Sequence, residues 1–139
     1  MQESVNNEVY YDKPLRMLGM AKKAGLIAIG SDAVKKAARA GKLKLVILAS
    51  DTSVSSRRQA HYSAEDSQAI CVDTPYTKFE FGNITGRGSP GTIAFLDFGL
   101  AAGFMKGLAT LDITRYGEIA KLLEKQMQTA NNRKRRTKK

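Results

Sequence analysis

A cluster of positive side chains is the feature of this sequence that most directly suggests chemistry. Residues 13–44 contain nine lysines and arginines but only one acid, Asp32. The solvated face of an ordinary helix mixes both signs, whereas a run of cations without acids neutralises the phosphates of a polyanion. This segment therefore favours a polyanionic partner, which is RNA, DNA or an anionic membrane surface.

The densest part of this segment surrounds a turn at residues 29–32, where a predicted strand meets a predicted helix. Backbone N–H groups at a helix start suit a phosphate or a base edge. Lys35 and Arg39 are four residues apart and share a helix face, with Lys36 beside them. Two further lysines end the preceding helix. The candidate contact residues here are Lys22, Lys23, Gly30, Ser31, Asp32, Lys35, Lys36 and Arg39.

Histidine and cysteine, which often carry acid–base or nucleophilic chemistry, occur once each. His61 lies in a polar stretch without a nearby acid to orient its ring, which favours a solvated surface residue over a general base. Cys71 lies in an apolar run, which favours an inert, buried thiol in a reducing cytosol. One histidine and one cysteine make no zinc site without carboxylates. We therefore expect no catalytic residue, metal, cofactor or small-molecule substrate.

The glycine-rich stretch 86–91 superficially resembles a phosphate-binding loop. It lacks a following lysine and precedes a predicted strand rather than a helix, so it does not predict nucleotide binding. The sequence also lacks the motif of a nucleophile elbow.

Composition predicts one globular domain with flanking segments. The chain has 139 residues, of which 42% are apolar, and no stretch approaches the roughly 20 apolar residues of a membrane span. Six of the ten net positive charges lie in residues 133–139, which leaves a formal net charge of about +4 for the rest. We expect a flexible leader at 1–12, an α/β/α domain at 13–112, a helix at 113–130 and a disordered basic tail at 131–139.

Helical and strand patterns alternate along the domain. Asp12 and Pro14 predict a capped helix start, and Ser31 or Asp32 is expected to cap the second helix. The apolar run 43–49 shows little alternation, which is typical of a strand buried on both faces. These patterns predict an α/β fold, a three-layer α/β/α sandwich with a four-stranded mixed sheet. The expected helices are 14–24, 33–40, 53–64, 76–84, 100–108 and 115–128, and the strands 26–29, 43–49, 68–72 and 92–96.

Four stretches, 15–25, 30–37, 41–51 and 77–90, resemble the kink-turn RNA-binding ribosomal protein superfamily (L-seven-Ae and L-thirty-e type), in its bacterial ribosomal-protein-like form. Together they span about residues 13–108. The resemblance implies an α/β/α sandwich, in agreement with the alternation of elements. It also implies a non-enzymatic, cytoplasmic RNA-binding protein that is ribosome-associated or binds a kinked structured RNA.

The family motif Gly-x-Asn-Glu-x-x-Lys reads sheared G·A pairs of a kink-turn. Gly30 and Lys36 match its first and last positions, while Asp32 and Ala33 stand in place of its Asn and Glu. An aspartate still accepts a hydrogen bond from a guanine edge, but it does not donate and it repels phosphate.

Two further positions carry the resemblance. Lys78 matches a lysine that contacts RNA. The loop Gly86, Arg87, Gly88 and Ser89 takes the place of an apolar loop that packs on a flipped-out nucleotide, so its contacts are expected to be more polar, with Arg87 stacking or pairing with phosphate. Ser53 stands where the family often has an acid.

Two other functions remain open from the sequence. A protein-interaction adaptor could use the same fold, with residues 115–128 docking a partner, and a non-specific nucleic-acid binder would need only the basic segments. The fold also occurs as the substrate-binding part of RNA methyltransferases, but no cofactor-binding domain follows it here. We expect a structured RNA partner, including the ribosome, no membrane partner, and a monomer when free.

Overall fold

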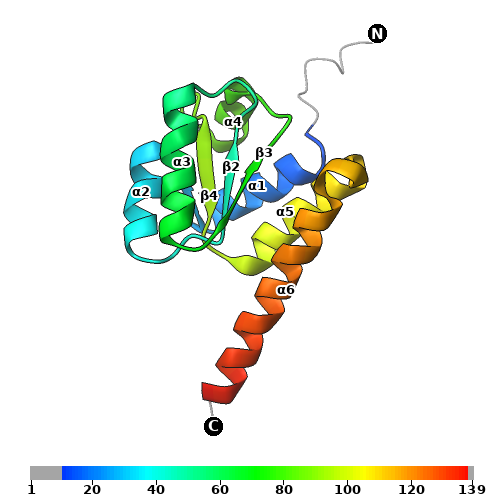
Figure 1. The fold of residues 1–139 in the computed structure, drawn as a ribbon. Helices are drawn as coiled ribbons and strands as arrows, with labels where there is room; N and C mark the ends of the chain where they lie inside the picture. The colour runs from blue at the N-terminus through cyan, green and yellow to red at the C-terminus, as the bar shows by residue number, and fades with distance from the viewer. Residues whose placement is uncertain (1–10, 138–139) are drawn as a thin grey trace.

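A four-stranded mixed sheet forms the centre of the molecule. The computed structural model describes residues 11–137. The strands are β1 (Ile27–Ile29), β2 (Leu45–Leu48), β3 (Ile70–Asp73) and β4 (Thr92–Phe95), in the order β1-β4-β2-β3. Strand β2 is parallel to β3, whereas β4 is antiparallel to both β1 and β2. The predicted α/β/α sandwich with a mixed sheet is confirmed (Figure 1).

Helices cover both faces of this sheet. Helices α2 (Ser31–Arg39) and α3 (Val54–Asp66) pack on one face in a core cluster that includes Val46, Leu48 and Ala94. Helices α1 (Lys13–Lys23) and α5 (Phe98–Leu111) pack on the other face with Ile47 and Ile93. Helix α4 (Lys78–Thr85) contacts α1, and α6 (Ile113–Thr137) contacts α5.

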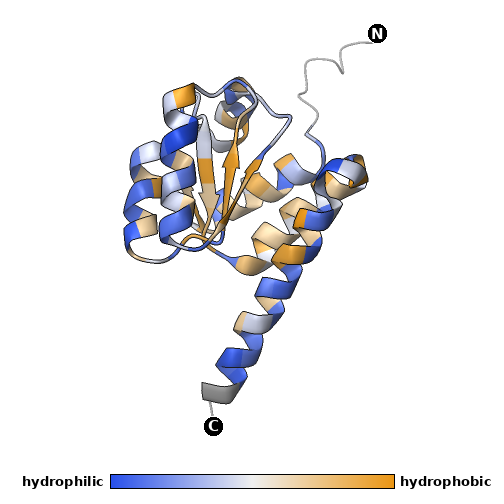
Figure 2. Ribbon diagram, in the orientation of Figure 1, coloured by the Kyte–Doolittle hydropathy of each residue, from blue (hydrophilic) through white to orange (hydrophobic). Residues whose placement is uncertain are grey.

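Burial on both faces explains the apolar strands. Every residue of β2 and of β4 is buried, so neither strand needs the alternation of a half-exposed sheet. In Figure 2 the strands are mostly hydrophobic, while hydrophilic residues lie on the outer sides of α2 and α3 and along the far part of α6. The core therefore lies between the layers, and the residues that follow the strand ends lie at the edge of the sheet.

The beginning of α1 follows its predicted cap, but that of α2 does not. The Asp12 carboxylate accepts a hydrogen bond from the Leu15 N–H at 3.2 Å. The prediction that Ser31 or Asp32 caps α2 is wrong, because the helix begins at Ser31 and its N-cap is Gly30. Gly30 has a φ of 90°, which favours glycine over residues with a Cβ atom.

Two other helix boundaries differ from expectation because of side-chain caps. Helix α4 begins at Lys78 rather than at residue 76, since Thr77 and Glu80 form a reciprocal capping box. Helix α5 begins at Phe98, two residues early, because the Asp97 carboxylate accepts from the Leu100 N–H at 2.9 Å. Its buried face outweighs the low helix propensity of its glycines.

The terminal segments are also corrected where they are described. The prediction of a disordered tail from residue 131 is wrong as far as Thr137, because α6 continues to that residue. Residues 131–137 contain no glycine or proline, and lysine and arginine are good helix formers that suit the negative end of the helix dipole. The predicted flexible leader at 1–12 lies largely outside the described residues, but Tyr11 packs against the core and Asp12 caps α1.

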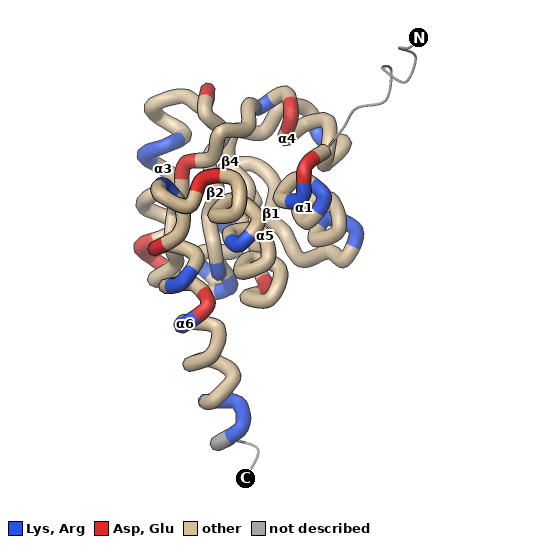
Figure 3. The backbone as a smooth tube through the Cα atoms, turned by 90° about the vertical axis from the view of Figure 1, so that its right-hand side faces the viewer, with Lys and Arg blue, Asp and Glu red and all other residues tan. Residues whose placement is uncertain are grey.

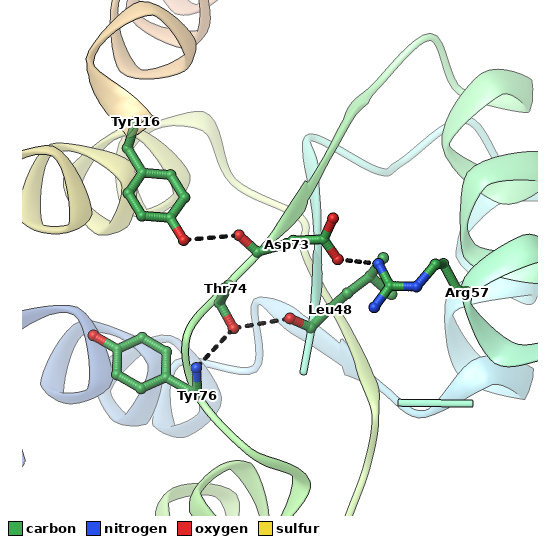
Figure 4. A network of polar contacts seen from close by, with 6 residues as sticks. All are labelled: Leu48, Arg57, Asp73, Thr74, Tyr76 and Tyr116. Atoms are coloured by element: carbon green, nitrogen blue, oxygen red, sulfur yellow. Dashed lines mark hydrogen bonds and ion pairs between the residues drawn. The ribbon is translucent and has the colours of Figure 1, made fainter. Parts of the chain in front are cut away.

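A polar network ties the end of β3 to three other elements (Figure 4). The Thr74 hydroxyl donates to the Leu48 carbonyl at 2.8 Å and accepts from the Tyr76 N–H at 3.3 Å. The Tyr116 hydroxyl donates to the Asp73 carbonyl at 3.0 Å, and the Asp73 carboxylate pairs with Arg57. The end of β3 is thereby joined to β2, α3 and α6.

The bond from Tyr116 should contribute to folding stability. Tyr116 is 2% exposed, and a buried neutral hydrogen bond contributes about 1 kcal/mol. We expect Tyr116→Phe to lower the free energy of unfolding, measured by urea denaturation, by about 1 kcal/mol. The matched control Tyr62→Phe, on a side chain that is 62% exposed, should change it by less than about 0.5 kcal/mol. Equal losses would contradict a role for the Tyr116 hydroxyl.

Candidate nucleic-acid interface

One edge of the sheet gathers residues that are far apart in the sequence. Because β4 is antiparallel to its two neighbours, its first residue lies at the edge where β1 and β2 end. Helices α2 and α3 begin at this edge, and the chain leaves β3 there toward α4. We call the group formed by Gly30, Ser31, Asp51, Lys78 and the loop 86–91 the strand-end surface.

Backbone hydrogen bonds hold the strand-end surface together. The Gly30 N–H donates to the Thr92 carbonyl at 2.9 Å, and the Ala49 N–H donates to the Gly91 carbonyl at 2.9 Å. The Lys78 N–H donates to the Asp51 carboxylate at 2.8 Å. These hydrogen bonds, together with those between the strands, therefore fix the starts of α2 and α4 relative to the glycine-rich loop.

The first turn of α2 presents backbone donors at this edge. Because its N-cap, Gly30, has no side chain, no side-chain oxygen of the cap accepts a hydrogen bond from the first N–H groups of the helix. A Cβ atom on Gly30 would meet nothing within 4 Å, so the space beside it is open. The positive end of the helix dipole and its N–H groups are thus available to an anion.

The glycine-rich loop approaches α4 closely. A Cβ atom on Gly82 would overlap the Gly88 carbonyl oxygen, and one on Gly91 would overlap the Thr52 side chain. Gly86 and Gly88 have positive φ values of 71° and 45°. The loop residues 86–89 are exposed, so Arg87 lies in solvent on a backbone whose path depends on glycine.

The lysines at the end of α1 lie beside this loop. The Lys22 Nζ atom is 4.0 Å from the position that a Cβ on Gly86 would occupy. Lys22, Lys23 and Arg16 also line an open groove between α1 and α4. Figure 3 shows lysine and arginine residues along α1. The structure therefore brings Lys22 and Lys23 near the loop 86–91, although α1 precedes it by about 60 residues.

The cations of α2 divide between two faces. Lys35 and Arg39 share one face, as predicted, and with Ser31 they line a groove between α2 and α3. Lys36 and Asp32, one turn apart, are exposed and do not line this groove. The groove also contains Tyr62, which sequence reasoning missed although an aromatic residue in a polar stretch was a usable signal.

Comparison with known proteins places these features in a family. A model of the ribosomal protein L7Ae/L30e/S12e/Gadd45 family matches residues 12–94. No curated protein matches the sequence significantly. A protein of unknown function from Bacillus halodurans C is 26% identical with a TM-score of 0.59, and the match covers 68% of this chain and 98% of that chain. The Giardia lamblia 15.5 kD RNA-binding protein is 17% identical with a TM-score of 0.55, covering 73% and 86% respectively, which shows a shared fold.

The histidine and the cysteine weighed for catalysis lie on different elements, α3 and β3. His61 is exposed on α3. Burial, followed by the charge of Asp73, raises the pKa of the Cys71 thiol from 9.0 to about 12, and Arg57 opposes the rise. Within residues 11–137, no group of three or more His, Cys, Asp or Glu could hold a metal ion, and no helix in that range is long and apolar enough to cross a membrane.

The raised pKa of Cys71 predicts slow thiol chemistry. Because the thiolate is the reactive form, a rise of about three pKa units should slow alkylation of the folded protein at pH 8 by about 1,000-fold relative to an unfolded cysteine. Iodoacetamide labelling followed by mass spectrometry, with and without urea, measures this ratio. Labelling at equal rates would contradict a half-buried, protonated thiol.

Proposed function

Because the chain belongs to the ribosomal protein L7Ae/L30e/S12e/Gadd45 family, as its four sequence stretches predicted, we propose that it binds a structured, kinked RNA on the strand-end surface. It acts by binding and not by catalysis. One observation carries the proposal: the turn at Gly30, Lys78 and the loop 86–91 form one edge through the Gly30–Thr92, Ala49–Gly91 and Lys78–Asp51 hydrogen bonds.

Phosphate contacts supply most of the affinity in this proposal. Lys36 and Lys22 are exposed, and Lys78 is half-buried at the first position of α4, so each ammonium group can reach an RNA strand laid along the edge. Such contacts release counterions and fix the orientation of the RNA. The N–H groups of the α2 first turn add a fixed positive site beside them.

Selectivity comes from the residues that face bases. Asp32 accepts from a base amino group, and Arg87 on the exposed loop stacks on an unpaired base or pairs with phosphate. Residues 13–112 form the RNA-binding unit, to which α6 is appended. We extend the proposal to a ribosome-associated, cytoplasmic protein that is a monomer when free, since the family includes ribosomal proteins.

The lysine contacts predict a specific loss of affinity and salt dependence. We expect Lys36→Ala and Lys78→Ala each to weaken binding and to reduce the slope of log Kd against log salt by about 1. Fluorescence anisotropy with a kink-turn RNA and an unkinked duplex of equal length, over a salt series, measures both quantities. The control Lys106→Ala removes an exposed lysine of α5 and should leave both unchanged.

The outcomes of this titration separate the parts of the proposal. Binding to neither RNA would reject RNA binding, and equal binding to both would reject recognition of the kink while leaving RNA affinity. In cells, Lys35→Glu with Lys36→Glu should reduce the RNA crosslinked to the protein. Unchanged crosslinking in that double variant would instead favour a protein-interaction adaptor.

Asp32 makes a second prediction, on selectivity. An asparagine both accepts and donates and does not repel phosphate, so Asp32→Asn should tighten binding to the kink-turn RNA by about tenfold, within the ~1–3 kcal/mol of a good base contact. The competing duplex should gain much less. Glu118→Gln, which removes one acid from the exposed surface of α6, is the charge-matched control. An equal gain in this control would show that only net charge matters.

A further inference from the structure

The groove between α2 and α3 is a second place where polar and aromatic groups converge. It encloses a cavity of about 220 Å³, which is far larger than a single water needs. Its polar lining includes two cations, one aromatic ring, one amide and three serine or threonine hydroxyls. These belong to Lys35, Arg39, Tyr62, Gln59, Ser31, Ser63 and Thr92.

The hydroxyl of Thr92 is the most informative of these groups. Side chains alternate along a strand, and Thr92 therefore shares its face of β4 with Ala94, which packs in the α2–α3 core. Thr92 is only 2% exposed and lines the groove. Its Oγ1 atom is buried and has no hydrogen-bond partner among the described residues. A buried hydroxyl without a partner is unfavourable, so a ligand that bonds to it gains affinity.

The two ends of the groove differ in charge. The Ser67 hydroxyl donates to the Ala38 carbonyl at 3.1 Å, which ties the last turns of α2 and α3 together and places Asp66 near Arg39. Ser31 and Thr92 lie at the other end, where α2 begins. The end at Ser31 and Thr92 has the positive pole of α2 and Lys35, which favour an anion. At the other end, near Arg39, the Asp66 carboxylate would repel an anion.

The ring of Tyr62 lies between these ends and is unusually accessible. Its side chain is 62% exposed, although it lines the groove. An exposed aromatic face is a platform on which a nucleobase stacks, and the sequence of the base matters little to such stacking. Inorganic phosphate would use only the cationic end, and an apolar molecule would use neither the hydroxyls nor the cations.

We propose that the α2–α3 groove binds one nucleotide unit, a nucleoside monophosphate group. Its phosphate lies at the beginning of α2, within reach of Ser31, Lys35 and Thr92, and its base stacks on Tyr62 toward Arg39. The unit is either a free mononucleotide or an unpaired residue of an RNA strand. The groove shares Ser31 and the first turn of α2 with the strand-end surface, but it takes Lys35, Arg39 and Tyr62 from residues outside that surface. Variants at Tyr62 and Lys36 therefore separate this inference from the kinked RNA proposed for the strand-end surface.

The test is a titration of the full-length protein with AMP, in which binding is monitored by the chemical shifts of the backbone amides in NMR spectra. We expect saturable shifts at Ser31, Lys35, Gln59 and Tyr62, with inorganic phosphate binding at least tenfold more weakly than AMP. Tyr62→Ala should weaken AMP binding at least tenfold, and Thr92→Val about threefold or more. Lys36→Ala, on the other face of the same helix, is the matched control and should bind AMP as the wild type does.

Three results would overturn the proposal: no saturable shifts with AMP, equal affinity for AMP and inorganic phosphate, or Tyr62→Ala binding AMP as well as the wild type. Tyr62 is exposed, so its replacement leaves the fold intact even if Thr92→Val does not. An RNA with 4-thiouridine at unpaired positions then identifies the source. A crosslink to Tyr62 assigns the unit to RNA, and AMP binding without that crosslink assigns it to a free mononucleotide.

The same variants separate this inference from the proposed function. Loss of RNA binding in Lys36→Ala with normal AMP binding supports two sites. Failure of the AMP titration while Lys36→Ala still weakens RNA binding rejects the groove alone, and AMP binding without any RNA binding rejects the strand-end surface alone.

Discussion

The structure depends on the insertion of β4 between β1 and β2. This strand arrives from the loop 86–91 and runs antiparallel to both neighbours, so its first residue meets the end of β1. Its extension pairs the Thr92 carbonyl with the Gly30 N–H and the Gly91 carbonyl with the Ala49 N–H, each at 2.9 Å. Without this pairing, the start of α2 and the glycine-rich loop would have no fixed relation to each other.

The same pairing places locally unfavourable features at one edge. An N-cap at φ 90° without a side chain and a buried hydroxyl without a partner each reduce stability, the second by about 1–3 kcal/mol. The surrounding layers offset these losses through the fully buried side chains of β2 and β4. Donors that are left without partners inside a rigid frame are already oriented for a ligand, which makes them useful to a binding protein.

Sequence patterns predicted the layers well because the information is local: continuous apolar strands alternate with helices that have one apolar face. They also selected Gly30, Lys36 and Lys78 through motifs. They missed the true cap of α2, where the N–H of Gly30 donates a hydrogen bond to a residue about 60 positions later in the sequence. They missed the groove for the same reason, since Thr92 and Tyr62 meet α2 only in the folded sheet. The extent of α6 is not predicted because residues 131–137 have no apolar residue to bury, although their lysines and arginines are good helix formers.

The positive charges of the chain serve different purposes according to where the fold places them. Lys78 belongs to the strand-end surface, Lys22 lies beside its loop 86–91, and Lys36 is exposed on α2, whereas Lys35 and Arg39 line the α2–α3 groove. The described part of the terminal basic run lies on the far part of α6, on the side opposite α4 (Figure 1), where Arg133 and Lys134 line grooves that also include Lys44 and Phe98. A short RNA held at the strand ends therefore does not meet that run. The lysines near the strand ends, the cations of the α2–α3 groove and the basic run of α6 all raise the salt dependence of binding to a long RNA. Only the strand-end lysines and the groove cations lie next to hydroxyls, N–H donors or an aromatic ring, which are the groups that distinguish one nucleic acid from another.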